Sequence, residues 1–225
     1  MKKLLILFTI LLTAKIAVAQ KNFEGEIDYR MYGLSGGQKD TTIGNSYKII
    51  FGKHSINMQS FTQKGILWEE QIMLLDSAKQ YVIDHRDKTY ILAWKYRPGT
   101  KPLISLPWGM DKIAVNPAIK KIVGYDAFDN FLTTEGHPEY GHVDLYEAKP
   151  LYFKLPPHIA LGSFFESMLF YDNHIMLAMR VISGKAPYGQ INRVATKVEV
   201  RRVDDSVFKI PAGYTLKELK PAVFN

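Results

Sequence analysis

The 225-residue chain contains no cysteine. Disulfides therefore contribute nothing to its stability, and the chain cannot carry the lipid-modified cysteine of a bacterial lipoprotein. It has no apolar run of about twenty residues, the length that a membrane-spanning helix needs. It also lacks the dense Lys/Arg stripe that would predict nucleic-acid binding. Stability must come from an apolar core, which a domain of about 200 residues is large enough to build.

The first 19 residues have the pattern of a secretory signal peptide. A basic start, Met1 to Lys3, precedes an apolar stretch from Leu4 to Leu12, and Ala17 and Ala19 have the small side chains of a cleavage site. Lys15 interrupts the apolar stretch too early for a retained anchor helix. We expect cleavage after Ala19 and an exported protein, periplasmic or extracellular. Removal of residues 1–19 deletes three lysines and no acidic residue, which lowers the formal net charge from +7 to +4.

Apolar and polar residues alternate with a period of two through much of residues 20–225, which we predict to form one domain. The pattern is clear from Phe23 to Met31, and it returns at residues 193–201, where it predicts that Arg193 faces water. Such alternation is typical of antiparallel strands with one apolar and one solvated face. The sequence therefore predicts a mainly β domain of nine to eleven strands.

Two strand segments, residues 72–75 and 175–182, are apolar on both faces, which indicates that something covers the outer side there. One helix is predicted between Pro157 and Asp172, because apolar residues recur there at spacings of three and four. A long connection with four prolines is predicted between Tyr96 and Ala118.

A sheet of about ten strands with one apolar face must curl or be covered. We therefore predict a strongly curved antiparallel half barrel whose apolar concave face is closed by a lid, made of the helix and the long connection. A two-sheet sandwich is the alternative.

Three motifs support this fold by resemblance. Residues 23–29 (FEGEIDY), 122–127 (IVGYDA) and 208–214 (FKIPAGY) resemble secreted Bacteroidetes proteins of unknown function, which are similar to the LolA/LolB lipoprotein-carrier superfamily. The resemblance spans nearly the whole chain after residue 19. It implies a curved half barrel with a helical lid and an apolar cavity for acyl chains or similar lipids, and it implies no catalytic residue.

The segment from Gly33 to Gly37 fits the G-x-S-x-G pattern of serine hydrolases, with Ser35 at the nucleophile position. In those enzymes the serine lies between a strand and a helix. The residues after Ser35 are polar and have no helical periodicity, so we interpret the segment as a loop between strands.

His137 and His142 are weak candidates for metal ligands in a metal-assisted hydrolase, because a hairpin could bring them together. Their spacing matches no established zinc motif. Nothing else in the sequence predicts a metal or a cofactor. The histidines at positions 54, 85, 158 and 174 are scattered near turns and are predicted to lie on the surface.

Aromatic and apolar residues of the strands and the lid are the candidate ligand-binding residues. They are Trp68, Tyr81, Tyr90, Trp94, Trp108, Met110, Phe164, Phe165 and Met168. The leading hypothesis is a non-enzymatic binding or carrier protein that holds a lipid-like or other apolar ligand against the concave face. The alternative is a cell-envelope interaction protein that binds a protein partner and no small ligand.

Overall fold

A computed structural model of the chain describes residues 21–35, 38–40, 45–94, 110–134, 142–156, 159, 169–171, 173–182 and 190–218. The regular structure of these residues is almost entirely β, with one short 3-10 helix. No helix in this part of the chain is long and apolar enough to cross a membrane.

The strands are β1 (Gly25–Ser35), β2 (Gln38–Asp40), β3 (Ser46–Phe51), β4 (Ser55–Phe61), β5 (Leu67–Leu74), β6 (Lys79–Asp84), β7 (Thr89–Trp94), β8 (Met110–Ile122), β9 (Tyr125–Thr134), β10 (His142–Tyr152), β11 (Phe170–Tyr171), β12 (His174–Ile182), β13 (Gln190–Val200) and β14 (Thr215–Leu216), with the 3-10 helix η3 (Asp205–Phe208). They form one sheet in the order β14-β7-β6-β5-β4-β3-β1-β13-β12-β10-β9-β8, with β2 beside β1 and β11 beside β12. All neighbours are antiparallel except β14 and β7.

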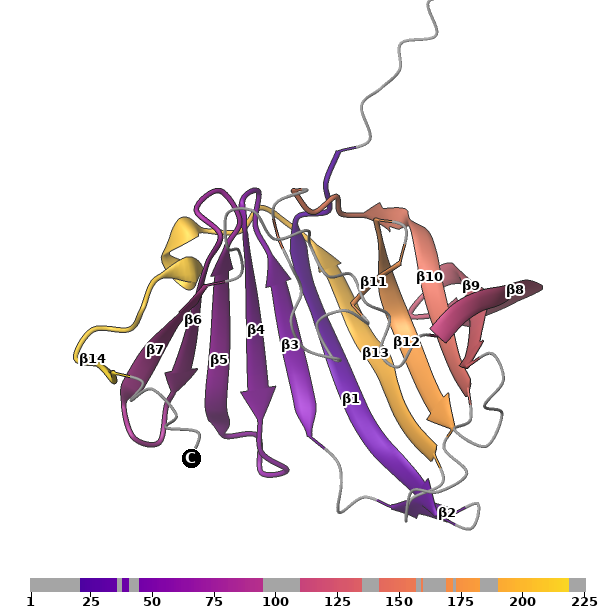
Figure 1. Cartoon of the computed structure of the whole chain (residues 1–225), viewed down its shortest axis with the longest axis horizontal. Coiled ribbons are helices and arrows are strands. Elements are labelled where there is room, and N and C mark those ends of the chain that lie inside the picture. The colour runs from indigo at the N-terminus through magenta and orange to yellow at the C-terminus, as the bar shows by residue number, and fades with distance from the viewer. Residues whose placement is uncertain are drawn as a thin grey trace, which may run out of the picture.

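Figure 1 shows this sheet as one broad, twisted layer that does not close. The prediction of a mainly β, curved antiparallel half barrel is confirmed. The strands with six or more residues number eleven among the described residues, and the other three have two or three residues each. The prediction of nine to eleven strands therefore leaves out only the short strands β2, β11 and β14.

The predicted long connection between residues 96 and 118 ends earlier than expected, because the chain from Met110 onward forms β8. Pro117 lies in this strand at a register irregularity between Asn116 and Ile119. β8 is the last strand of the sheet order, and a proline without an N–H is tolerated at an edge or a bulge. A proline that favours a loop in the sequence is thus accommodated within a strand.

The remaining parts of the predicted lid, residues 96–109 and 160–168, lie outside the described residues. The predicted helix does not continue to Asp172, because Phe170 and Tyr171 pair with β12. Asn173 adopts a positive φ of 62° in the turn between β11 and β12.

One face of the sheet, which we call the inner face, carries the main apolar cluster. Its fully buried members include Ile27, Ile49, Ile56 and Leu177. The ring of Phe51 lies among three other rings, with centroids 5.4 Å from Phe23, 5.2 Å from Phe153 and 6.0 Å from Phe170. Tilted and edge-to-face ring pairs of this kind contribute about 0.5–1.5 kcal/mol each beyond the area they bury. The cluster therefore joins the start of the chain to segments that follow it by more than a hundred residues.

The opposite, outer face of β3 to β7 is covered by residues 203–216, which we call the strap. Val203 and Phe208 of the strap form a second apolar cluster with Ile50, Ile72 and Ile83. Ile72 is completely buried in this cluster. The prediction that residues 72–75 pass under a cover is thus confirmed for Ile72, and the strap is that cover.

Polar contacts fix both ends of the strap to the sheet. The amide Nδ2 of Asn57 donates a hydrogen bond of 2.7 Å to the carbonyl of Val207. At the other end, the backbone N–H of Lys217 donates to the carbonyl of Tyr90 over 2.8 Å, next to the short parallel pairing of β14 with β7. Because backbone groups on both sides are satisfied, the strap is part of the folded domain.

Gly52 leaves the space that the Phe208 ring fills, since a Cβ at position 52 would come within 2.6 Å of that ring. Gly52→Ala is expected to lower the free energy of unfolding by about 1–3 kcal/mol, the usual cost of overpacking. Urea titration measures this. In a Phe208→Leu background the same substitution should cost clearly less, and an equal cost in both backgrounds would contradict the contact.

Val123 and Gly124 form the two-residue turn between β8 and β9, with φ values of 45° and 88°. A β-branched residue is strained at positive φ, whereas Asn-Gly is the preferred pair for such a hairpin turn. Val123→Asn is expected to raise the melting temperature, by about 2–4 °C if about 1 kcal/mol of strain is removed. Val123→Thr, which is polar but still β-branched, is the control and should give no gain; a lower melting temperature for the Asn variant would refute the strain.

Candidate functional site

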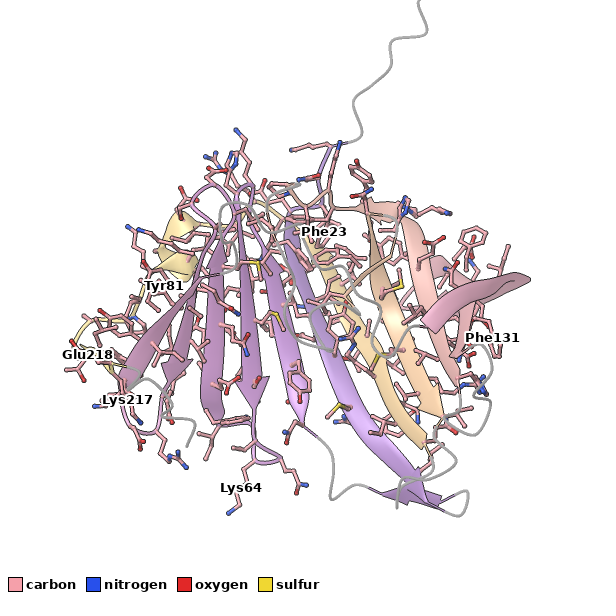
Figure 2. All side chains as sticks on the ribbon, viewed as in Figure 1. Phe23, Lys64, Tyr81, Phe131, Lys217 and Glu218 are labelled. Carbon is pink, nitrogen blue, oxygen red and sulfur yellow. The ribbon has the colours of Figure 1, made fainter. Side chains whose placement is uncertain are left out.

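A groove of about 1750 Å³, which we call the rim groove, lies at one end of the sheet. It is lined by residues 21–24, 53–55, 125, 150–151, 200–206 and 208–209. Gly25 pairs with Phe51 on one side and Val200 on the other, so the groove follows the aligned ends of β3, β1 and β13. Figure 2 labels Phe23 at this end of the sheet. Because the lining comes from distant parts of the sequence, no contiguous motif encodes it.

The apolar lining of the rim groove belongs to both clusters. Phe23 and Leu151 are buried members of the main cluster, and Val203 and Phe208 are buried members of the second. Val200 also lines the groove but is 67% exposed. The groove therefore borders the buried interior on both sides of the sheet and presents apolar surface to its contents.

Backbone hydrogen bonds hold the residues that line the groove. The N–H of Phe23 donates to the carbonyl of Tyr152 over 2.6 Å. The N–H of Arg201 donates to the carbonyl of Glu24, and the N–H of Val203 donates to the Oε1 of Glu24 over 2.9 Å. Residues 21–24 are therefore fixed between the end of β10 and the segment that follows β13.

The charged lining is more basic than acidic. Five cationic side chains, at positions 21, 53, 201, 202 and 209, face three acidic ones, at positions 24, 204 and 205. Hydrogen bonds from Ser206, whose N–H lies 2.7 Å from Asp204, lower the pKa of Asp204, so this carboxylate is ionised while it caps η3. The rim groove carries a net excess of positive charge at neutral pH.

A buried guanidinium lies on the inner face, where the alternation predicts none. Arg193 is 4% exposed and lies over the ring of Tyr29, 5.3 Å from the ring centroid. The prediction that Arg193 faces water is wrong, because the register of β1 and β13 shifts between Asp28 and Tyr29 and turns this part of β13 over. Burial lowers the pKa of Arg193, an effect that the nearby Tyr29 and Tyr47 oppose.

A second polar cluster lies on the outer face of β9, β10 and β12. Asp144 is 2% exposed, and the guanidinium of Arg180 donates to its Oδ2. Asp129 is also buried and accepts a hydrogen bond from Tyr146. Burial, followed by the charge of Asp144, raises the pKa of Asp129. The sequence does not reveal this pair, because the two aspartates come from different strands.

A third polar network lies beneath the strap. The Oε2 of Glu70 lies 3.0 Å from Nε2 of His85, whose Nδ1 lies 2.8 Å from the hydroxyl of Tyr214. The side chains of His85 and His174 are 15% and 13% exposed, so the prediction that these two histidines lie on the surface is wrong. His85 follows β6 in a turn, as expected, but the strap covers that turn. The network fixes the strap and borders no large cavity among the described residues.

The weak metal candidates are not brought together by the described part of the chain. His142 lies 3.9 Å from Asp144, a contact between Nε2 and Oδ1, while His137 is outside the described residues. No group of three or more histidine, cysteine, aspartate or glutamate side chains suitable for a metal occurs among the residues that are described. Ser35 ends β1 and pairs with β2, so the chain turns into a strand and not into the helix of a hydrolase.

The candidate ligand-binding aromatics lie on the outer face. Strand register places Trp68, Tyr81 and Tyr90 on the same face as Ile72 and Ile83, under or beside the strap. Alternation predicts their common face but does not tell which face borders a cavity. Trp68 and Tyr90 line a separate hollow of about 170 Å³.

The other candidates are described only in part. Trp94 ends β7, and Met110 begins β8. Trp108, Phe164, Phe165 and Met168 lie outside the described residues. Their role in ligand binding stays a prediction. The described lining of the rim groove, by contrast, includes none of these candidate ligand-binding residues.

No family model matches the sequence, and no curated protein matches it. Among solved structures, an uncharacterized conserved protein from Thermus thermophilus superposes with a TM-score of 0.52 at 5% identity, over 88% of this chain and 93% of that chain. PNGF-II gives 0.47 at 12% identity, over 88% of this chain and 31% of that chain. A LolA superfamily protein from Nitrosomonas europaea gives 0.38 at 10% identity, over 89% and 96%. The first likeness supports the open β fold, and a likeness at such low identity carries no activity.

The raised pKa of Asp129 predicts how the effect of replacing Asp129 on the melting temperature depends on pH. The folded state binds a proton at Asp129 more readily than the unfolded state does. The stability that this proton contributes is fully present below the pKa of Asp129 in the unfolded chain, and it is lost as the pH rises through the pKa of Asp129 in the folded chain. Asp129→Asn, which stays uncharged, should therefore raise the melting temperature at neutral pH, and the gain should shrink toward about pH 4.

Calorimetry at both pH values measures this effect. Asp126→Asn, an exposed position of the same strand that pairs with Lys121 over 3.1 Å, is the matched control. Asp126→Asn should change the melting temperature little. A gain for Asp129→Asn that is the same at both pH values would show that the charge of Asp129 is not the cause.

Proposed function

We propose that the chain is an exported binding or carrier protein that holds a lipid-like ligand in the rim groove. The observation that carries this proposal is the apolar lining of the groove, where Phe23 and Leu151 of one cluster and Val203 and Phe208 of the other reach the same opening. Apolar surface that borders water at a concave site favours an apolar ligand.

The size of the groove favours a chain-like ligand over a compact metabolite. Pockets for small molecules typically have volumes of about 300–1,000 Å³. The rim groove is larger, at about 1750 Å³, and it extends from the β3–β4 turn to the segment after β13. An acyl chain can lie along such an opening and bury its length against several side chains.

The chemistry of the described lining supports binding without catalysis. His54 lines the groove, but its Nδ1 lies 3.2 Å from the exposed carboxylate of Asp76. Ser206 gives its N–H to the cap at Asp204. Neither contact forms the nucleophile and base pair that covalent catalysis needs.

Export through the pattern in residues 1–19 is part of this proposal, and cleavage after Ala19 would leave a chain that begins one residue before the groove lining. The resemblance of three motifs to secreted Bacteroidetes proteins favours the same location. A cell-envelope partner is the second candidate, because Trp68 and Leu216 are large apolar side chains that are 40% and 55% exposed.

Binding of the uncharged, polarity-sensitive dye Nile red to the chain without residues 1–19 tests the proposal. Val200→Gln replaces an exposed apolar side chain of the groove and should weaken dye binding about fivefold, the effect of losing about 1 kcal/mol of apolar contact. Ile66→Gln is the matched control, since Ile66 is 62% exposed in the turn between β4 and β5. Figure 2 labels the neighbouring Lys64 at the end of the sheet opposite Phe23.

The control variant should bind the dye like the unchanged chain. Equal weakening in both variants would mean that the dye binds elsewhere, and it would contradict ligand binding in the rim groove. No dye binding by the unchanged chain, together with recovery of an envelope protein by cross-linking in the intact cell, would favour the second candidate.

A further inference from the structure

We propose that the rim groove selects amphipathic ligands with an anionic head group, a phosphate or a carboxylate, and that Lys53, Arg202 and Lys209 recognise this group. The inference rests on the proposed function, because it assigns the polar part of the same ligand. The proposal is based on which charged side chains of the groove are already paired within the protein and which are not.

The acidic side chains of the groove are largely committed to the protein itself. The Oε1 of Glu24 accepts the N–H of Val203, and the Oδ1 of Asp204 accepts the N–H of Ser206. These carboxylates fix the backbone of the groove wall, so their position is set by the fold. Asp205, in the first turn of η3, is the remaining acid of the described lining.

Apart from Lys21, at the start of the described chain, the cations of the groove fall into two kinds. Arg201 donates to the Oε2 of Glu26 over 3.0 Å and lies 3.5 Å from Glu199, and the hydrogen bond to Glu26 raises the pKa of Arg201. Its charge is thus compensated within the sheet. Lys53, Arg202 and Lys209 are exposed and have no carboxylate within ion-pair distance among the described residues, although the charges of Lys209 and Arg202 help to lower the pKa of Asp204. Because none of the three is held in a direct ion pair, their side chains can turn toward a ligand.

The fold brings two of these cations to the same place. Gly52 lies directly against the ring of Phe208, with the distance from an added Cβ to the ring only 2.6 Å. Lys53 and Lys209 are the chain neighbours of this contact pair, and both line the groove. A lysine from the β3–β4 turn and a lysine from the end of η3 therefore flank one end of the apolar lining.

An anionic head group fits this arrangement better than a neutral one. Exposed cations attract a phosphate or carboxylate when the salt concentration is low. Phe23, Leu151 and Val203 line the same groove, and the apolar surface there suits an acyl chain and not a free anion. A ligand with an anionic head group and an acyl chain would contact both the cations and the apolar lining of the groove.

Calorimetric titration of the chain without residues 1–19 with three probes tests the inference. The probes are dihexanoyl phosphatidate, dihexanoylglycerol and inorganic phosphate. At low salt, phosphatidate should bind about tenfold more tightly than the uncharged glyceride, and the preference should shrink in half-molar salt because exposed charges are screened. Inorganic phosphate should bind far more weakly than phosphatidate.

A double variant with matched controls assigns the residues. Lys53→Gln with Lys209→Gln should remove most of the preference for phosphatidate and leave the affinity for the glyceride unchanged. Lys64→Gln with Lys217→Gln removes the same charge away from the groove, at positions that Figure 2 labels, and should keep the preference. Retention of dihexanoylglycerol binding also shows that the variant is folded.

The outcomes separate this inference from the proposed function. Equal affinity for the phosphatidate and the glyceride would overturn the head-group selection and leave lipid binding in place. Phosphate binding as tight as phosphatidate binding would overturn the amphipathic ligand, since the acyl chains would then contribute nothing. Failure of both lipids to bind would overturn the inference and the proposed function together.

Discussion

Burial of the Phe51 ring is the interaction on which the rest of the structure depends. The rings that surround it are Phe23, two residues before β1, Phe153, the residue after β10, and Phe170 of β11. An open sheet of this width has a strong twist, and hydrogen bonds between neighbouring strands do not hold distant strands together. The ring cluster does so, because it joins β3 to segments that follow β10 across the inner face. The curvature of the half barrel is therefore a consequence of packing on one side.

The strap meets a second requirement of the same sheet. β5 and β6 place Ile72 and Ile83 on the outer face, where they would otherwise contact water. Val203 and Phe208 cover them, and the small residue Gly52 allows Phe208 to approach the β3–β4 turn. The inner cluster and the strap both end at the rim of β3 and β1, so both apolar clusters border the same opening there. The rim groove forms where the inner apolar cluster and the strap come together, and its lining therefore combines apolar residues of both clusters with charged residues at the edge of the sheet.

Alternation in the sequence predicts the fold class because it reports which residues share a face. It fails where the period of two is broken by the backbone. A register shift opposite Tyr29 turns Arg193 inward, and a bulge allows Pro117 within β8. Alternation also does not tell which face a distant segment will cover. The sequence therefore predicts His85 to lie on the surface, although Tyr214 of the strap contacts it. The sequence does not reveal the groove for the same reason, because its lining forms only when five remote segments meet.

The three motifs that resemble secreted Bacteroidetes proteins encode backbone geometry. A Cβ at Gly25 would lie 2.1 Å from the carbonyl oxygen of Glu199, Gly124 closes a hairpin at positive φ, and Gly213 has a φ of 83° just before Tyr214. Substitution at these positions would disturb strand pairing, a turn or the strap, whatever the ligand. Of the three proposed head-group residues, all of which are exposed, Lys53 and Arg202 lie outside the motifs and Lys209 lies within the third. Exposed side chains can change at little cost in stability. The constraints that make the fold recognisable thus overlap with those that choose a head group only at Lys209, and a chain with the same motifs and other residues at positions 53 and 202 would keep the half barrel while its head-group preference changed.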